Sequence, residues 1–106
     1  DIKENIQSLE RVLWRDFNEF GHAELNGNQL YFKSLIDSVS YTINDEIIIR
    51  NYDSIKLVPL SDTFFLDGEV SKQGHVDAIK VSFKAPYSSN DLFVFGYKDA
   101  SFYLNQ

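Results

Sequence analysis

The stretch NIQSLERVLWRDFNEFG, from Asn5 to Gly21, decides the fold of this chain. Large apolar side chains recur in it every three or four residues, which is the spacing of one face of an α-helix. A glycine follows, as it does after many helices, and Asp1 and Glu4 have the spacing of an N-terminal capping box. We therefore predict a helix over residues 2–20, roughly 28 Å long.

One stripe of this predicted helix is apolar, and the rest of its surface is mostly charged or polar. The side chains expected to hold the helix against the rest of the domain are Ile2, Ile6, Leu9, Leu13, Phe17 and Phe20. Burial contributes about 1.5–3 kcal/mol for each large side chain, whereas an isolated helix of this length is marginal in water. The helix is therefore predicted to pack on a sheet.

Trp14 lies well off that stripe, roughly 120° from Ile2 around the helix axis. Tryptophan is enriched among the residues that dominate binding energies, so one interpretation is that Trp14 contacts a partner. The other interpretation is that a loop of the same domain covers it. The sequence leaves both open.

Short apolar or alternating segments follow the helix. The clearest, SVSYTIN at residues 38–44, places Val39, Tyr41 and Ile43 on one face, and it is predicted to pair with the run EIIIRNY as a hairpin over 38–50. Pro59 suggests a strand at an edge or an exit from the sheet. Further strands are expected after the Asn26-Gly27 turn through Leu30 and Phe32, and within residues 54–60, 62–68 and 76–84, with a hairpin at 69–74. Residues 91–98 and 100–105 are expected to form either one bent strand or a final hairpin around Lys98-Asp99.

One helix followed by strands predicts an α+β fold, with an antiparallel sheet packed on one long N-terminal helix. A length of 106 residues predicts a single domain, residues 1–106. The chain has no internal repeat and no linker-like stretch.

Charge and composition exclude several classes of function. The net charge is −6 and no cluster of Lys or Arg is present, which disfavours binding to nucleic acid or to an anionic membrane. The chain has no cysteine, so disulfide scaffolds and thiol catalysis are excluded. It also has no apolar run long enough to span a bilayer.

The segment 91–98 is apolar on both faces, with Leu92 and Val94 on one side and Phe93, Phe95 and Tyr97 on the other. The favoured interpretation is a central strand that is covered on both sides. The alternative is a strand whose aromatic face is exposed and contacts a partner.

No recognised arrangement of catalytic residues is present, so we predict no catalytic, cofactor or metal site and no enzyme activity. His22 and His75 have no second histidine or cysteine at ligand spacing and are expected to be surface residues. Loop carboxylates at Asp45-Glu46 or at Asp62, Asp67 and Glu69 leave a hard-cation site open, although DTFFLDG does not fit a calcium-binding EF-hand loop.

The segments LERVLWRDF, LYF, VSYTINDEIIIRNY and VDAIKVSF resemble minor pilin-like proteins, namely the pseudopilins of bacterial type II secretion and the minor pilins of type IV pilus or competence systems. The chain is similar in particular to the soluble domains of J-type minor pseudopilins. Their helix ends in an R-D-[FL] pattern, here Arg15-Asp16-Phe17, and their V-x-Y-x-[IL] strand turns into a strand that ends in arginine, here Arg50.

This resemblance implies a pilin-like fold and a structural role in a filament that helps to move folded cargo through an outer-membrane channel. It implies other pilin-like subunits as partners, no cofactor and no small-molecule substrate. The family's cleavage site and apolar segment would then lie upstream of Asp1 and anchor the domain at the periplasmic or extracellular face of the inner membrane.

Two rival functions remain at this point. The first is a periplasmic or extracellular ligand-binding domain of cystatin-like or half-barrel shape, with an aromatic pocket lined by Phe64, Phe65, Phe93, Phe95 and Tyr97. The second is an enzyme of the same shape that pairs His22 or His75 with an aspartate. A large apolar cavity between helix and sheet would favour the ligand-binding domain, and a filled interior would favour the scaffold. The enzyme would need a histidine and a carboxylate that meet inside that cavity.

Overall fold

One long helix opens the fold. The computed structural model describes residues 2–21, 23–44, 46–84 and 91–96, and in it α1 spans Ile2–Phe20, as the apolar spacing predicts. Gly21 ends the helix with φ +82°, and its N–H donates to the Phe17 carbonyl at 2.9 Å. A residue without a Cβ adopts this left-handed conformation at little cost, which explains the stop. Asp1, the other half of the expected capping box, lies outside the described residues.

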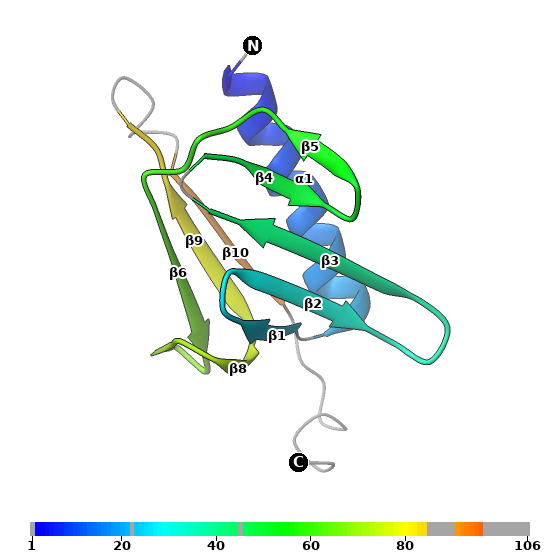
Figure 1. Cartoon of the computed structure of the whole chain (residues 1–106). Helices are drawn as coiled ribbons and strands as arrows, with labels where there is room; N and C mark the ends of the chain where they lie inside the picture. Colours follow the sequence, from blue (N-terminus) through cyan, green and yellow to red (C-terminus); the bar gives the residue numbers. More distant parts are fainter. Residues whose placement is uncertain (1, 22, 45, 85–90, 97–106) are drawn as a thin grey trace.

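Antiparallel strands follow and form two sheets, which confirms the α+β class (Figure 1). The larger has the order β5-β4-β3-β2-β1-β8 and is called sheet A; the smaller has the order β10-β9-β6-β7 and is called sheet B. The strands in the described ranges are β1 (Ala23–Asn26), β2 (Gln29–Lys33), β3 (Ser38–Ile43), β4 (Ile48–Arg50), β5 (Asp53–Ile55), β6 (Ser61–Leu66), β7 (Glu69–Ser71), β8 (Gly74–Val76), β9 (Ala78–Ser82) and β10 (Leu92–Phe95).

Sheet A contains the predicted hairpin of residues 38–50. β3 pairs with β4 in the register Tyr41↔Arg50, and the inward side chains Val39, Tyr41 and Ile43 are buried. The alternation of apolar and hydroxyl residues therefore gave the correct buried face. β2 also alternates as predicted, with Leu30 and Phe32 buried.

The single predicted sheet is wrong, and the reason lies in residues 69–76. This stretch is polar enough to resemble one hairpin turn, yet it holds two short strands that belong to different sheets: β7 pairs with β6, and β8 pairs with β1. The predicted pairing of the flanking segments is confirmed, because β6 and β9 pair antiparallel. At the corner, Asp77 donates its N–H to the Phe65 carbonyl and accepts from the Gly96 N–H, each at 2.8 Å.

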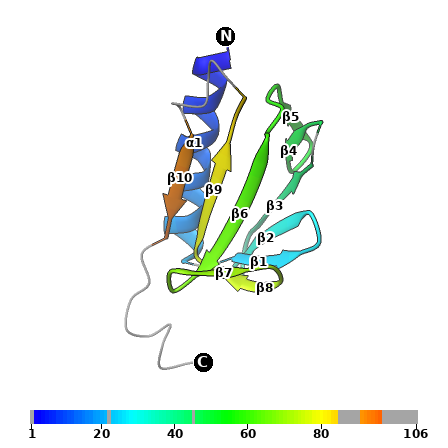
Figure 2. The same ribbon diagram turned by 90° about the vertical axis from the view of Figure 1, so that its left-hand side faces the viewer.

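The helix contacts both sheets, mainly through β10 of sheet B and β2 of sheet A. Figure 1 shows α1 behind sheet A, and Figure 2 shows it beside β10 of sheet B. The core between these elements includes Ile6, Leu9, Leu13 and Phe17 from the helix. Phe32 of β2 is fully buried there, and its ring meets the Phe17 ring edge-on at 4.8 Å between centroids. These side chains form a buried apolar core between the helix and the sheets.

The two ends of the predicted stripe differ from each other. Ile2 is 43% exposed, so it does not hold the helix to the sheets. The reason is position: the first turn of α1 extends past the strands at the top of Figure 1, where little protein surface is available to cover it. Phe20 at the other end is half-buried and packs against the core, with its ring 5.9 Å from that of Phe32.

Candidate interaction surface

β10 has one buried and one exposed face. Leu92 and Val94 point into the core, whereas Phe93 and Phe95 are 52% and 51% exposed. The favoured prediction of a central strand covered on both sides is therefore wrong: among the described residues β10 is the outermost strand of sheet B, and the side chains of its outer face are about half exposed. The alternative, an exposed aromatic face, describes these two residues. Tyr97 lies outside the described residues.

Four aromatic rings meet on this outer face, and we call Trp14, Phe65, Phe93 and Phe95 the aromatic patch. Trp14 of α1 and Phe95 of β10 are in edge-to-face contact, with ring centroids 5.3 Å apart and an interplanar angle of 88°. Phe93 lies 6.1 Å from Phe95 and 5.8 Å from Phe65 of β6. The patch therefore runs without a break from the helix across sheet B.

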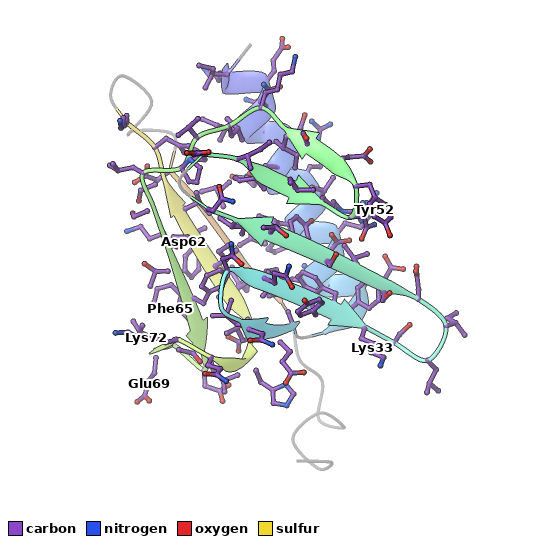
Figure 3. All side chains as sticks on the ribbon, viewed as in Figure 1. Lys33, Tyr52, Asp62, Phe65, Glu69 and Lys72 are labelled. Atoms are coloured by element: carbon purple, nitrogen blue, oxygen red, sulfur yellow. The ribbon has the colours of Figure 1, made fainter. Side chains whose placement is uncertain are left out.

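Sheet register explains why these rings meet. Phe95 and Phe65 are both directly opposite Ala78 on the intervening strand β9, so a small side chain separates two large ones. Ala78 is buried although it lies on the outer face, which means that the rings around it shield it. Val70 of β7 is opposite Phe65 and largely exposed, and it extends the apolar row. Phe65 lies on the sheet B side of the molecule in Figure 3.

Gly96 brings β10 close to the helix. A Cβ at this position would lie 2.9 Å from the Phe17 carbonyl oxygen and 3.2 Å from that of Gly21, which is too close for any larger residue without a shift of the backbone. The end of β10 can therefore approach the last turns of α1 only with glycine here. This approach is consistent with the contact between Trp14 and Phe95.

Trp14 itself is 47% exposed. No loop covers it in the described part of the chain; its ring contacts Phe95 of a strand and leaves about half of its surface in water. This is the arrangement that the partner-contact interpretation requires, because a ring held by one neighbour can still offer a free face.

A buried polar cluster fixes the helix on sheet A. Asp16 of α1 is 1% exposed and accepts a short hydrogen bond from the Tyr41 hydroxyl of β3. Arg50 of β4 donates to both carboxylate oxygens of Asp16, from Nε and Nη2, at 3.0 Å each, and its Nε lies 3.2 Å from the Tyr41 hydroxyl oxygen. The bidentate pair and the Tyr41 hydrogen bond join α1, β3 and β4, and they fix the orientation of the helix about its own axis.

The protonation states of Tyr41 and Arg50 are strongly fixed. Burial, and secondly the hydrogen bond to Asp16, raise the pKa of Tyr41 far above its usual value. The hydrogen bond to Asp16 raises the pKa of Arg50, against the opposing effect of burial. The cluster is stabilised by the neutral form of the Tyr41 phenol and the charged form of the Arg50 guanidinium. It therefore stabilises the fold and is not suited to proton transfer.

The sequence analysis did not predict that these three residues contact each other, although all three belong to the motifs on which the pilin-like resemblance rests. Asp16 is the aspartate of the R-D-[FL] pattern, Tyr41 is the tyrosine of V-x-Y-x-[IL], and Arg50 ends the following strand. The sequence therefore shows an acid on the helix, and a tyrosine and an arginine on two neighbouring strands. It does not show that they meet, because this depends on the pairing of Tyr41 with Arg50 in the sheet.

The other candidates from the sequence lie apart from the patch. His75 is exposed on β8 and lines a groove of about 410 Å³ with Glu24 and Tyr31, whereas His22 and Asp45 lie outside the described residues. Within residues 2–21, 23–44, 46–84 and 91–96, no three His, Asp or Glu side chains gather as a metal site would require.

The phenylalanines that the rival ligand-binding interpretation requires do not line one pocket. Phe64 is buried in the core, whereas Phe65, Phe93 and Phe95 stand on the outer face of sheet B. Neighbouring residues of one strand, Phe64 and Phe65, point to opposite faces, so they cannot line one cavity.

Comparison with known proteins gives no relative: no protein-family model, no curated protein and no solved structure matches this chain. No helix in the described ranges combines the length and apolarity needed to cross a membrane. The function proposed below therefore rests on the residues and their geometry.

Proposed function

We propose that this domain is a structural subunit that works through protein–protein contacts, and specifically a pilin-like component of a type II secretion pseudopilus or a type IV pilus-like filament. The observation that carries the proposal is the aromatic patch, in which Trp14, Phe93 and Phe95 are each about half exposed and the ring of Phe95 contacts the other two. Trp and other aromatic side chains supply large contact areas at low entropic cost, and they dominate many interfaces.

The position of the patch supports a binding role. Its rings stand on a helix and two strands rather than on loops, so a partner would meet a surface that is already ordered. A preformed surface lowers the entropy lost on association. Such a surface offers contact area and no reactive group, which favours a subunit of an assembly over a catalyst.

The buried cluster supports the pilin-like part of the proposal. It gives one physical reason for three separate motif residues, Asp16, Tyr41 and Arg50, because each is needed to hold the long helix against the sheet. In this proposal other pilin-like subunits are the partners. The domain stands at the periplasmic or extracellular face of the inner membrane, and an upstream apolar helix holds it there.

A site-specific cross-link tests the proposal in cells that naturally make the protein. A photo-reactive residue in place of Phe93 should cross-link to a second subunit that carries a pilin-type leader and apolar segment. The matched control is the same replacement at Tyr52, which is fully exposed at the β4–β5 turn and lies on sheet A, away from the patch (Figure 3).

The two positions separate the outcomes. Cross-linking to such a subunit from Phe93 and not from Tyr52 supports the proposal. Cross-links from Phe93 only to proteins that lack that segment, or equal products from both positions, would contradict it.

A further inference from the structure

Lys80 is the only charged side chain that the described strands of sheet B direct to the outer face. In the sheet register it is directly opposite Phe93 of β10 and Thr63 of β6. Opposite residues of antiparallel strands point to the same face, so Lys80 stands beside the aromatic patch. The other side chains that these strands direct outward, apart from the rings and Ala78, are the uncharged Ser61, Val70 and Ser82.

Lys80 has no ionic partner in the part of the chain that the structure describes. It is exposed, and no described carboxylate lies within ion-pair distance of its ammonium group. Asp91 precedes β10 by one residue, but its carboxylate accepts the Phe83 N–H at 3.1 Å. A single unpaired cation therefore stands among aromatic side chains.

A protein that covers the aromatic patch must also cover Lys80. Strand β9 lies between β10 and β6, so the side chain of Lys80 leaves the sheet inside this surface and not at its rim. An ion that is taken out of water without a partner costs several kcal/mol. This cost would offset the burial of at least one large apolar side chain, which contributes about 1.5–3 kcal/mol. An interface over the patch therefore needs an anionic group opposite Lys80.

Charge distinguishes the possible occupants of this face. A second copy that docks by the same face would bring another Lys80 and, among the described residues of that face, no acid. An anionic membrane normally recruits clusters of basic residues, whereas this face has one lysine on a chain of net charge −6. A protein surface with one carboxylate among apolar side chains matches both the rings and the lysine. The net charge does not prevent this pairing, because charges more than about 8 Å apart are largely screened at physiological ionic strength.

We propose that the aromatic patch and Lys80 together bind a segment of a different protein in which an Asp or Glu is flanked by apolar side chains. The carboxylate accepts hydrogen bonds from the Lys80 ammonium group, and the flanking side chains pack on Trp14, Phe93 and Phe95. The inference rests on the protein–protein contact in the proposed function and adds the chemistry of the partner. It does not require the partner to be pilin-like.

Substitutions at Lys80 test the inference in the cells that make the protein, with the photo-reactive residue again at Phe93. Lys80→Met keeps a long side chain but removes its charge, so it leaves the partner's carboxylate unpaired. The yield of the cross-link should fall at least about tenfold, and Lys80→Arg should retain most of it. Lys33→Met is the matched control, because it removes an exposed lysine from sheet A, away from the patch (Figure 3), and it should leave the yield unchanged.

The direction of the Lys80→Met effect decides between a carboxylate and a wholly apolar partner surface. A wholly apolar surface would bind Lys80→Met better than the wild type, and a yield that stays equal or rises would overturn the inference while leaving the proposed function standing. An equal loss in Lys33→Met would overturn it too. A Lys80-dependent cross-link to a protein without a pilin-type leader would support the inference and contradict the proposed function. No cross-link to any protein would overturn both.

Mapping the cross-link locates the acid on the partner. The cross-linked peptide should contain an Asp or Glu beside the attachment point or one helical turn away from it. Changing that acid to lysine should abolish the cross-link to the wild type, and Lys80→Glu should recover it. A cross-linked peptide without an acid would overturn the inference. Lys80-dependent binding to vesicles of phosphatidylcholine and phosphatidylserine, without a protein cross-link, would assign the patch to a membrane instead.

Discussion

Trp14 and Asp16 lie two residues apart on α1, and their environments are the reverse of what their polarity suggests. The carboxylate is almost completely buried, whereas the indole ring is about half exposed. Asp16 is tolerated inside because Arg50 and Tyr41 donate to it, and Trp14 remains outside because it contacts the exposed face of an edge strand. Burial here follows the partners that each position meets.

The two regions also differ in what they do for the molecule. The Asp16–Tyr41–Arg50 cluster joins the helix to sheet A, so its loss should lower the free energy of unfolding. Trp14, Phe93 and Phe95 of the aromatic patch are about half exposed and lie outside the hydrophobic core, so we expect their loss to reduce binding more than stability. Stability measurements on the isolated chain can therefore separate the two, and the expected effects below run from the largest to the smallest.

Leu13→Asp should unfold the domain, because Leu13 is completely buried and the new carboxylate would have no charged partner there. The matched control is Ile2→Asp on the same predicted stripe, which should melt within a few degrees of the wild type because Ile2 is substantially exposed. Circular dichroism with thermal melting measures both. Equal destabilisation by the two variants would show that the end of the helix is buried after all.

Arg50→Met should lower the free energy of unfolding by about 3 kcal/mol, because it leaves the Asp16 carboxylate buried without its charged partner. Arg15→Met is the control, since the Arg15 Nε lies 3.9 Å from Asp16 on an exposed side chain and should matter by less than about 0.5 kcal/mol. Urea denaturation at neutral pH compares them. If both substitutions lowered the free energy of unfolding equally, the ion pair between Arg50 and Asp16 would not be what holds the helix on sheet A.

Tyr41→Phe should cost about 1.5 kcal/mol at neutral pH by removing a donor to the buried carboxylate. It should also change the pH dependence, because the pKa of Tyr41 is raised in the folded state. A tyrosine whose pKa is raised on folding stabilises the folded state fully at pH values below its pKa in the unfolded chain, about 10. Above that pH, the free energy of unfolding falls by up to about 1.4 kcal/mol per pH unit. Urea denaturation from neutral to alkaline pH should show this decline in the wild type and less of it in Tyr41→Phe.

Trp14→Ala should cost only about 1 kcal/mol, the scale of one aromatic contact with partial burial. Phe17→Ala, three residues along the same helix and fully buried, should cost about 3–5 kcal/mol. Thermal melting of both variants measures the difference. A Trp14 variant as unstable as the Phe17 variant would make Trp14 a core residue and remove it from the aromatic patch.

Much of the local structure could be predicted from the sequence, because periodic apolar side chains act within one element. The bounds of α1, the Gly21 stop and the buried face of β3 all follow from spacing. The candidate surface was only half predictable. The alternation of Phe93 with Val94 shows two apolar faces, but whether the second face is covered depends on whether another element packs on it, and Phe93 and Phe95 are about half exposed.

The sequence by itself determined the elements of this protein: a long amphipathic helix, alternating strands, and acidic, cysteine-free chemistry without a nucleophile motif. Only the tertiary structure decided that there are two sheets, that β10 is an edge strand, and that Asp16, Tyr41 and Arg50 meet. The physical reason is that helices and turns depend on near neighbours in the chain. Sheet order, and hence which side chains are covered, depends on contacts between residues far apart in sequence.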